Sequence, residues 1–559
     1  NKDFIEKRNR FHELAQSEIN PEITPEDVRE MLIQHILTED IFNNVFGNAA
    51  FHHYNNIARE LEGVLNTFMD YGVRQNHLQS IKSYYDTIRD ASAGLADHHE
   101  KQKFLKNIYE NFYKVYNPKG ADRLGVVYTP NEIVRFMIEG ADYLLEKHFG
   151  KSLGSKGVEI LDPATGTGTF VAELIEYISP HDLEYKYLNE IHANEVAILP
   201  YYIANLNIEY TYQQKMNDYQ EFRNICFVDT LDNTAALDYS GKQDMLFGLS
   251  SENAERIKKQ NDRKISVIIG NPPYNAKQPN YNFQNANRAY KEIDKKIKDT
   301  YIKDGTAQNQ IVIYDMFVRF FRWATDRLER KNGIIAFVSN SSFIDSQAFD
   351  GFRKVVGEEF NEAWIINLKG NARTSGERRR REAGNVFDDQ IRVGVAVYFF
   401  IKNENKKGFK VYYNEIGDYV KSFEKKEYLR TNKLTDIRFE QIEPDAKHNW
   451  INQTDNDWDD LMPLIDKDVK AGKSEEAIFK LFSSGLKTQR DEWVYDFSKD
   501  ALEEKMRYFV DIYEATRKDE HFADKMKIKW DRELEKYLKN KIKKEYSYLK
   551  IQKALYRPY

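Results

Sequence analysis

The chain has 559 residues, a formal net charge of −6 at pH 7 and one cysteine, Cys226, which excludes an internal disulfide framework and a cysteine-rich zinc site. Its longest apolar runs fall well short of the ~20 residues that cross a bilayer, so we expect a cytoplasmic protein with no membrane segment and no metal site. At roughly 150 residues per domain the length predicts about three or four domains, and the net acidity argues against a general polyanion binder while leaving room for a DNA enzyme with a locally basic groove.

Residues 1–118 are predicted to be helical. A helix start is indicated by Thr24, which is followed by a proline and, three residues on, by Asp27. The segment 117–120, Asn-Pro-Lys-Gly, ends the helical pattern, and we place a domain boundary there. Apolar residues recur at helical spacing in three stretches, 28–37, 54–69 and 104–116.

From 119 to 435 short apolar runs alternate with helical patterns. This alternation is typical of an α/β domain with a mostly parallel sheet that helices cover on both faces. The expected strands are 157–161, 187–195, 225–228, 265–269, 333–338, 363–368 and 393–401. The expected helices are 131–145, 169–177, 196–207 and 314–328.

Beyond 435 the alternation stops, and residues 436–559 are predicted to form a mixed α+β region. Four of the six tryptophans lie here. The stretch 525–553 is rich in lysine with acids interspersed, and we expect a solvated helical face there. Because the sequence lacks an initiator methionine and stops at Tyr559 without a polar tail, we expect it to be part of a longer protein.

The first predicted strand ends in a ligand-binding pattern. Asp162 closes the strand, and Gly166 and Gly168 form a Gly-x-Gly turn before a helix. In open α/β sheets ligands bind beyond the carboxyl ends of strands, and glycines let the backbone approach them closely. The third glycine of the dinucleotide motif and a complete phosphate loop are missing, and an acid suits a cationic ligand group. A plain tight turn is the alternative.

Two further predicted strands also end in acids. Glu195 ends the second strand and suits two ribose hydroxyls. Asp229 ends the third and suits the exocyclic amine of adenine. Each acid alone would be interpreted as a solvated loop residue or a helix cap. Three on successive strands favour a cofactor that contains a nucleoside.

The fourth predicted strand runs into Asn271-Pro272-Pro273-Tyr274. Together with the Asp-Pro-x-x-Gly-x-Gly motif at 162–168, this motif resembles the DNA adenine-N6 methyltransferases in which the cofactor motif precedes the catalytic motif and a recognition domain. The resemblance implies a Rossmann-like methyltransferase sheet, S-adenosylmethionine as cofactor and double-stranded DNA as partner. A Pro-Pro turn that merely ends a strand is the alternative.

The chemistry of methyl transfer explains the catalytic motif. An exocyclic amine conjugated with a purine is a poor nucleophile, and two acceptors aimed at its hydrogens free its lone pair. The resemblance assigns these acceptors to the side-chain oxygen of Asn271 and the main-chain carbonyl of Pro272. Consecutive prolines restrict the backbone, so the acceptors are positioned in advance. Tyr274 gives a stacking face for a base extruded from the duplex.

Other segments match the same family pattern. The segment 128–130 resembles the one that closes over the methionine end of the cofactor, and 384–387 resembles the motif whose phenylalanine packs on the target base. An ordinary core phenylalanine is the alternative for Phe387. The expected cofactor residues are Tyr128, Thr129, Pro130, Asp162, Ala164, Gly166, Gly168, Phe170, Glu195, Asp229 and Asn271. The expected catalytic residues are Asn271, Pro272, Pro273, Tyr274 and Phe387.

Two loops are expected to contact DNA. One is the basic loop 371–381, which lies just before the 384–387 motif, and the other is the polar loop 485–490. Their side chains suit phosphates and groove edges. A solvated charge run and an ordinary turn are the alternatives. The expected DNA-binding residues are Arg373, Arg378, Arg379, Lys487, Thr488, Gln489 and Arg490.

Nearly the whole chain resembles type ISP restriction-modification enzymes, which carry nuclease, motor, methyltransferase and target-recognition parts in one chain. Additional marks are the segments 34–46, 484–491 and 556–558. The resemblance implies a helical coupler-like domain at 1–118, an N6-adenine methyltransferase domain at 119–435 and a partial target-recognition domain at 436–559. No complete phosphate-loop motif and no nuclease constellation occur in the sequence, so we expect motor and nuclease parts upstream in the parent protein.

The favoured function is therefore methylation of N6 of a flipped adenine, as the modification part of a restriction-modification enzyme. The Asn-Pro-Pro-Tyr motif also serves methylation of a protein glutamine amide, which is one alternative, and RNA is another. A catalytically silent DNA-recognition module is the alternative from a different class. The long region after 435 and the 384–387 motif favour DNA.

Overall fold

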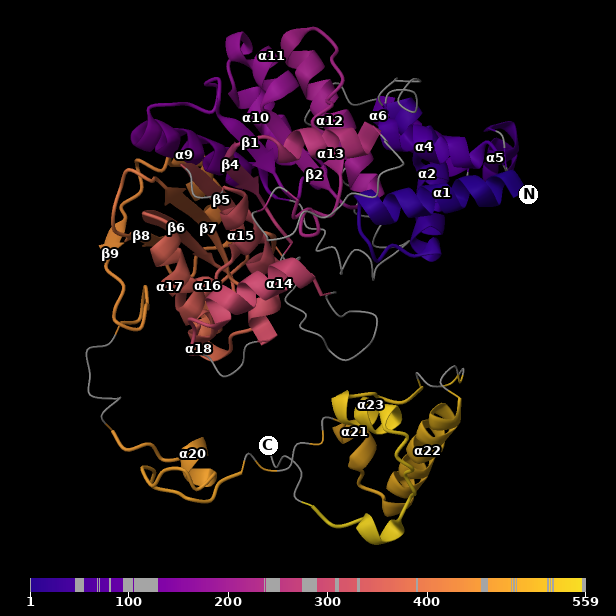
Figure 1. The fold of residues 1–559 in the computed structure, drawn as a ribbon, viewed down its shortest axis with the longest axis vertical. Helices are drawn as coiled ribbons and strands as arrows, with labels where there is room; N and C mark the ends of the chain where they lie inside the picture. Colours follow the sequence, from indigo (N-terminus) through magenta and orange to yellow (C-terminus); the bar gives the residue numbers. More distant parts are fainter. Residues whose placement is uncertain are drawn as a thin grey trace. The chain divides into compact units, whose positions relative to one another are not determined.

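A computed structural model describes the fold of the chain in two compact units (Figure 1). The larger unit comprises Asn1–Gln278 and Asn287–Gln453, and the C-terminal unit comprises Pro279–Ala286 and Thr454–Tyr559. The residues described are 2–45, 55–67, 69, 71–79, 82–93, 104, 129–235, 237, 252–273, 289–306, 311–328, 332–388, 391–453, 461–483, 485, 488, 490–519, 522, 524 and 527–554.

The N-terminal part of the larger unit is helical, as predicted. The expected helix start is confirmed, because Thr24 Oγ1 and the Thr24 amide both donate to Asp27 while the Asp27 amide donates back to Thr24 Oγ1. Most of the stretch 104–116 lies outside the described residues. The helices here are α1 (Lys2–Glu18), α2 (Pro25–Val45), α4 (Asn56–Leu65), α5 (Tyr71–Leu78) and α6 (Lys82–Ala93).

A sheet of nine strands forms the centre of the larger unit, in the order β3-β2-β1-β4-β5-β7-β6-β8-β9. Neighbours from β3 to β5 are parallel, and β7 is antiparallel to both β5 and β6. The strands are β1 (Glu159–Asp162), β2 (Ile191–Glu195), β3 (Ile225–Phe227), β4 (Ile265–Gly270), β5 (Gly333–Asn340), β6 (Glu362–Lys369), β7 (Val395–Lys402), β8 (Lys410–Glu415) and β9 (Glu440–Ile442).

Strand β2 begins later than the sequence pattern predicts. The expected strand 187–195 was too long, because residues Pro180–Asn189 form a helix that starts with a proline in its first turn. Strands β8 and β9 extend the sheet past the last expected strand, and β9 lies beyond residue 435. The larger unit therefore runs further along the chain than the alternation of apolar runs indicates.

Helices cover both faces of the sheet, which explains why β4 is apolar apart from Ser266. Val267 and Ile269 pack into the core beneath α9, whereas Ile268, pointing the other way, packs into the core with α15. A strand buried on both faces has no polar face to present to water. The helices are α9 (Asn131–Phe149), α10 (Thr169–Tyr177), α11 (Pro180–Asn189), α12 (Ile198–Met216), α13 (Glu252–Asn261), α14 (Lys291–Ile297), α15 (Met316–Arg327), α16 (Ser342–Asp345), α17 (Asp350–Glu359), α18 (Gly376–Glu382) and α19 (Ser422–Thr431).

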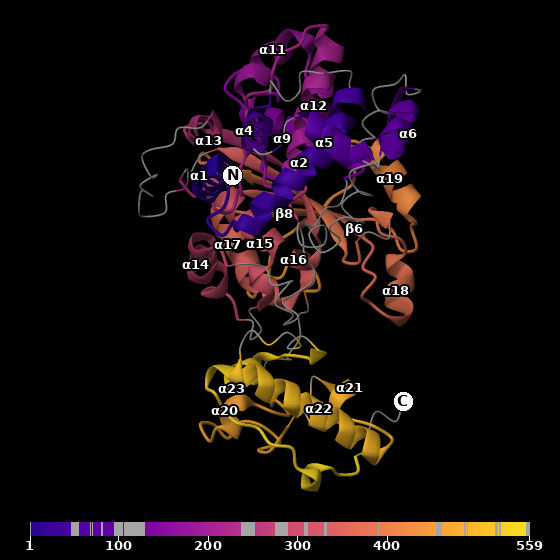
Figure 2. The same cartoon turned by 90° about the vertical axis from the view of Figure 1, so that its right-hand side faces the viewer.

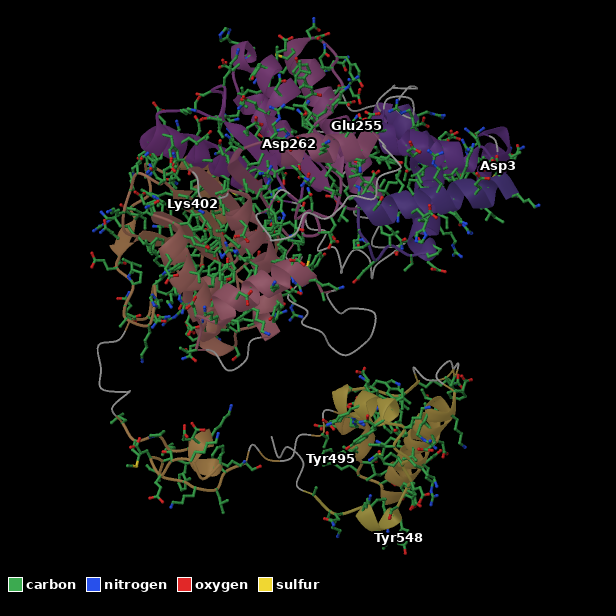
Figure 3. The ribbon with its side chains drawn as sticks, in the orientation of Figure 1. Asp3, Glu255, Asp262, Lys402, Tyr495 and Tyr548 are labelled. Carbon is green, nitrogen blue, oxygen red and sulfur yellow. The ribbon has the colours of Figure 1, made fainter. Side chains whose placement is uncertain are left out.

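The N-terminal helices pack beside α12 and α13, as two perpendicular views agree (Figures 1 and 2). Leu61 of α4 and Tyr202 of α12 belong to one apolar core. Charged side chains such as Asp3 on α1 and Glu255 on α13, both labelled in Figure 3, are exposed. The helical region and the sheet thus share a core within the larger unit.

The C-terminal unit has its own small core, in which Phe509 and Tyr513 of α22 pack with Trp530 and Leu534. No helix of the described ranges, in either unit, is long and apolar enough to cross a membrane. The helices of this unit are α20 (Lys467–Lys470), α21 (Asp491–Val494), α22 (Lys499–Lys518) and α23 (Arg532–Lys539).

Candidate active site

Four of the expected site residues follow one another along a single edge of the sheet. Strands β3, β2, β1 and β4 are parallel neighbours in that order, so their carboxyl ends bring Asp229, Glu195, Asp162 and Asn271 into a row. Three strand spacings of about 4.8 Å make this row roughly 14 Å long. The strand order reverses between β1 and β4, which is where α/β sheets bind ligands.

Asp162 is a buried carboxyl with an unused acceptor. Its side chain is 1% exposed, and its Oδ1 accepts a hydrogen bond from the Ala164 amide at 3.2 Å. Its Oδ2 is buried and has no hydrogen-bond partner among the described residues. Burial raises the pKa of this carboxyl to about 8. A cationic ligand group would stabilise the ionised form at this position.

The turn after β1 requires glycine at two positions. Gly166 and Gly168 have φ of 56° and 86°, in the left-handed region. A Cβ atom at Gly168 would also lie 3.0 Å from Cα of Ala204 on α12. The backbone of the turn therefore packs directly against α12. Its other side, which also lacks side chains at the glycines, allows a ligand to approach the backbone closely.

Glu195 holds this turn from the neighbouring strand. Its Oε2 accepts from the Gly166 amide at 2.8 Å, and its Oε1 accepts from the Val196 and Ala197 amides at 2.9 and 2.8 Å. Burial raises the pKa of Glu195 to about 7. A carboxylate accepts about four hydrogen bonds, so three amides leave little capacity, and binding of ribose by Glu195 stays a prediction.

Asp229 is buried at the third strand tip. Its Oδ1 accepts from the Leu231 amide at 3.1 Å and its Oδ2 accepts from the Tyr290 hydroxyl at 3.0 Å. An adenine amine at this carboxylate would share Oδ2 with Tyr290 or displace it. Tyr290 lies far from the strand motifs in sequence, and no pattern indicated its contact with Asp229.

Asn271 has one side-chain atom fixed and the other unused. Its Nδ2 donates to Thr129 Oγ1 at 2.9 Å, whereas its Oδ1 is buried without a partner among the residues described. The preceding Gly270 approaches the cofactor strand so closely that a Cβ there would lie 2.8 Å from Asp162 Oδ1. The unused oxygens of Asp162 and Asn271 thus belong to adjacent strand ends. Pro130 caps α9 directly after Thr129, Pro272 is buried and Pro273 is half-buried.

Three side chains that the sequence motifs did not indicate support the glycine turn. Asn207 of α12 donates to the Thr167 carbonyl at 2.8 Å. Thr230 donates to the Pro163 carbonyl at 2.6 Å, and Asn194 donates to Thr230 at 3.2 Å. These contacts join segments far apart in sequence, so no local spacing could have revealed them.

Two expected aromatic residues lie in the core. Phe170 is 4% exposed and Phe387 is 3% exposed, and both pack in the core with α9. The Phe387 amide donates to Asn385 Oδ1 at 2.9 Å, which fixes the 384–387 turn. The structure thus places Phe387 where the alternative interpretation had it, and stacking on a base stays a prediction. Tyr128 and Tyr274 lie outside the described residues.

The basic loop lies at the same edge of the sheet as the catalytic motif. Strand β6 is parallel to β5, because β7 is antiparallel to both, so the loop after β6 leaves from the carboxyl edge. Arg378 lies on the exposed helix α18, 3.6 Å from Asp345. Arg379 donates to the Ala383 carbonyl at the end of that helix. Arg373 precedes α18 in the same loop.

The second expected DNA loop has structural partners within the C-terminal unit. Thr488 donates to Asp491. Arg490 pairs with Asp531 and lies 5.3 Å from the ring centre of Phe509. These contacts join the starts of α21 and α23 to α22, which favours the ordinary-turn alternative for Arg490. Lys487 and Gln489 lie outside the described residues.

Three family models match separate parts of the chain. They are the coupler domain of type ISP restriction-modification enzymes at residues 1–100, the N-6 DNA methylase at residues 100–314 and the type ISP C-terminal specificity domain at residues 477–559. A solved DrdV–DNA complex is 53% identical over 97% of the chain, with a TM-score of 0.90. The chain belongs to the type ISP restriction-modification family. The resemblance stated from the sequence motifs is thereby confirmed.

Two structures of type ISP enzymes are also similar over almost the whole chain. LlaBIII bound to DNA is 33% identical over 97% of the chain, with a TM-score of 0.88. A nuclease-deletion mutant of LlaGI with a DNA substrate mimic is 34% identical over 98%, with a TM-score of 0.85. The chain covers 54% of the DrdV chain, 37% of LlaBIII and 45% of LlaGI. No curated protein matches the chain.

Proposed function

We propose that this chain is the modification part of a type ISP restriction-modification enzyme and methylates N6 of adenine in double-stranded DNA, with S-adenosylmethionine as methyl donor. The observation that carries the proposal is a pair of buried acceptors, Asp162 Oδ2 and Asn271 Oδ1, that have no hydrogen-bond partner in the described part of the chain. They lie at the ends of two adjacent strands, within the part of the chain that matches the N-6 DNA methylase family. A buried acceptor without a partner is costly, and a bound donor would complete it.

The row of strand tips fits the cofactor in order. S-adenosylmethionine has an adenine amine at one end, a ribose in the middle and a cationic amino acid at the other end. Asp229, Glu195 and Asp162 follow one another in that order along the sheet edge. When bound, the cofactor supplies an electrophilic methyl group. The unused Asp162 oxygen would accept from the ammonium of its amino acid end.

Asn271 and Pro272 would act on the target amine. The Asn271 oxygen and the Pro272 carbonyl would each accept a hydrogen bond from the amine, which directs the nitrogen lone pair toward the methyl group. Thr129 engages the Asn271 Nδ2 and leaves the oxygen for the substrate. In such a transfer the bond from the nitrogen to the methyl carbon would form as the bond from sulfur to that carbon breaks, with the electron pair left on sulfur and a proton lost from the nitrogen to water.

The surrounding parts would supply the partners. The basic loop with Arg373, Arg378 and Arg379 would contact phosphates beside the target base. The division into a coupler-like region at 1–118, a methyltransferase domain at 119–435 and a partial recognition domain at 436–559 stays a proposal, as do motor and nuclease parts in the parent protein. The similar type ISP enzymes with DNA, LlaBIII and LlaGI, and the similar DrdV–DNA complex support this assignment.

The test is methyl transfer from labelled S-adenosylmethionine to three acceptors, namely duplex DNA, RNA and protein. We expect label in N6-methyladenine of duplex DNA. Asn271→Ala should lower the rate at least about a hundredfold, since it removes an acceptor used in the transition state, while the exposed control Asn9→Ala should not. Label only in protein or RNA would contradict the DNA assignment. Cofactor binding without transfer to any acceptor would favour a silent recognition module.

A further inference from the structure

Helix α12 packs against the cofactor turn with one face. Ala204 lies against Gly168, where a Cβ on the glycine would come within 3.0 Å of the alanine Cα. One turn further, Asn207 donates to the Thr167 carbonyl at 2.8 Å. The position of α12 therefore decides where the backbone of the turn lies.

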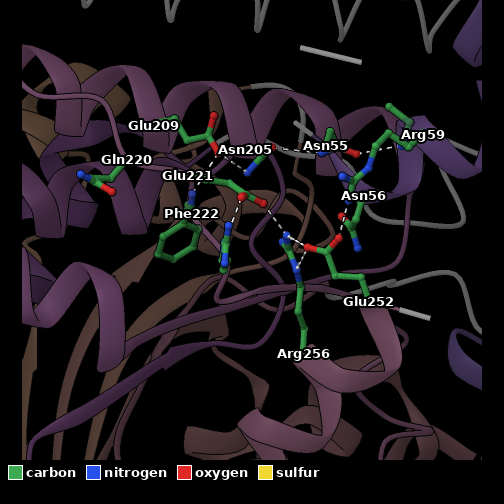
Figure 4. A network of polar contacts seen from close by, with 12 residues as sticks. Asn55, Asn56, Arg59, Asn205, Glu209, Gln220, Glu221, Phe222, Glu252 and Arg256 are labelled. Atoms are coloured by element: carbon green, nitrogen blue, oxygen red, sulfur yellow. Dashed lines mark hydrogen bonds and ion pairs between the residues drawn. The ribbon is translucent and has the colours of Figure 1, made fainter. Parts of the chain in front are cut away.

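The other face of α12 is hydrogen-bonded to the N-terminal helices. Asn55 donates to Asn205 Oδ1 at 3.0 Å (Figure 4). Tyr201 donates to Asn56 Oδ1 at 2.8 Å. His35 and the Tyr202 hydroxyl lie 3.0 Å apart. All of these side chains are buried. Buried polar pairs of this kind define a unique docking position, because any shift leaves a polar group unpaired.

The Asn55–Asn205 contact has a fixed direction. Asn55 Oδ1 accepts from the Ala58 amide and caps α4, so its Nδ2 faces α12. Asn205 Nδ2 donates to Glu209 at 3.1 Å, so its Oδ1 faces Asn55. Glu209 is held in turn by the Phe222 amide at 3.0 Å. Neither amide can rotate without breaking a second buried hydrogen bond (Figure 4).

The helical region also reaches the strand tip that carries Asp229. The Ile19 carbonyl, just after α1, accepts from the Asp229 amide at 3.0 Å. Asn253 donates to Glu18 at 3.2 Å and pairs with both backbone groups of Phe227 in β3. The helix behind the glycine turn, α12, and the end of β3 are therefore both held by the N-terminal helical region.

We infer that the N-terminal helical region positions the cofactor pocket, with Asn55 and Asn205 as positioning residues, so that docking of these helices and occupancy of the pocket stabilise each other. The inference rests on the proposed function, because it takes S-adenosylmethionine as the occupant. Such coupling is reciprocal. A movement of the helical region would weaken cofactor binding, and a bound cofactor would hold the helical region in place.

The test changes the direction of one hydrogen bond in the full chain. Asn55→Asp keeps the acceptor that caps α4 but turns a carboxylate oxygen toward Asn205 Oδ1. We expect the affinity for S-adenosylhomocysteine, measured by calorimetry, to fall about tenfold, as for a buried acceptor left unpaired. Asn9→Asp makes the same substitution at an exposed position of α1 and should leave the affinity unchanged.

Hydrogen exchange provides the reciprocal measurement. In the wild type, S-adenosylhomocysteine should slow exchange of the amides of α4, and in Asn55→Asp this protection should be lost. If Asn55→Asp does not fold, Asn55→Ser keeps a capping oxygen and should weaken binding about threefold. If the folded variants bind with wild-type affinity, or if α4 in the wild type is not protected from exchange, the inference would be overturned but the proposed function would not. A wild-type chain that binds no S-adenosylhomocysteine would instead overturn the proposed function.

Discussion

The two ends of strand β1 carry two buried carboxyls in opposite situations. At the start, Glu159 accepts from His192 at 2.6 Å and lies 3.4 Å from Arg263. At the end, three residues on, Asp162 has a side-chain oxygen without a partner among the residues described. The first carboxyl is completed by the protein, and the second is left for a ligand. Asp162 therefore differs from Glu159 in its hydrogen-bond set and not in its burial.

The same contrast extends to the neighbouring segments. At the starting edge of the sheet, the fully buried Lys186 bonds Glu190 and the Val158 carbonyl, and Glu190 also accepts from the Gly157 amide. At the carboxyl edge, Asn271 Oδ1 repeats the situation of Asp162. One edge of the sheet contributes stability, and the other retains unsatisfied acceptors for binding and chemistry.

The largest expected effect concerns Asp162. Asp162→Asn removes the charge that would attract a cationic group, so we expect cofactor affinity to fall about a hundredfold. The empty protein should become no less stable, since a neutral amide replaces a buried acid. Calorimetry with S-adenosylhomocysteine and thermal unfolding would check both. A variant that binds as well as the wild type would remove Asp162 from the pocket.

Glu159→Ala tests the other end of the strand. It should lower the free energy of unfolding by about 2 kcal/mol, because His192 loses a buried partner, while cofactor affinity changes less than about twofold. Denaturant unfolding and calorimetry measure the two quantities. A large loss of affinity with little loss of stability would show that the two ends do not differ as proposed.

The pKa of Asp162 predicts a pH dependence. Burial raises this pKa from 3.8 to about 8, so the empty protein loses stability as the pH rises from 4 to 8. Cofactor binding favours the ionised form, so the affinity should rise about tenfold from pH 6 to pH 7 and level off above 8. Glu195, with a pKa near 7, titrates in the same range. Comparison with Asp162→Asn isolates the Asp162 contribution, and an identical pH profile in that variant would contradict it.

The smallest expected effect concerns the basic loop. Replacing Arg378 and Arg379 together by alanine should weaken binding of duplex DNA a few-fold and reduce the slope of log affinity against log salt by about 1 to 2. Cofactor affinity should not change. Titration of labelled DNA at several salt concentrations would measure this, and an unchanged slope would leave both arginines as solvated surface charges.

The sequence motifs predicted the parts of the site that are local. Asp162, the two turn glycines and Asn271 each end a strand or follow it directly, and an apolar run that stops at an acid or an asparagine is visible in one segment. Asn207 and Tyr290 were missed because they reach the site from other elements, and Thr230, which follows Asp229, was missed because its partners Pro163 and Asn194 lie at the ends of other strands. Their contacts are set by packing, which no spacing within a segment encodes.

The apolar pattern could not separate two uses of an aromatic ring. Phe387 precedes a strand, and the same position suits a core residue and a base-stacking residue; its 3% exposure comes from packing against α9. The start of β2 was misplaced for a related reason. Tyr187 is buried, so its apolar character matched a strand, although it lies in α11. A short apolar stretch of sequence looks the same whether its residues are buried by a neighbouring helix or within a sheet.

The contact between Gly270 and Asp162 restricts how this enzyme family can be altered. No side chain can be added at 270 without displacing the carboxyl of Asp162, which we propose binds the cofactor, and the next residue along the chain is Asn271. Enlarging the space for a transferable group bulkier than methyl must therefore come from the segments that surround the strand ends. Variants selected to use cofactors with a bulkier transferable group should keep Gly270 and carry their substitutions in those surrounding segments.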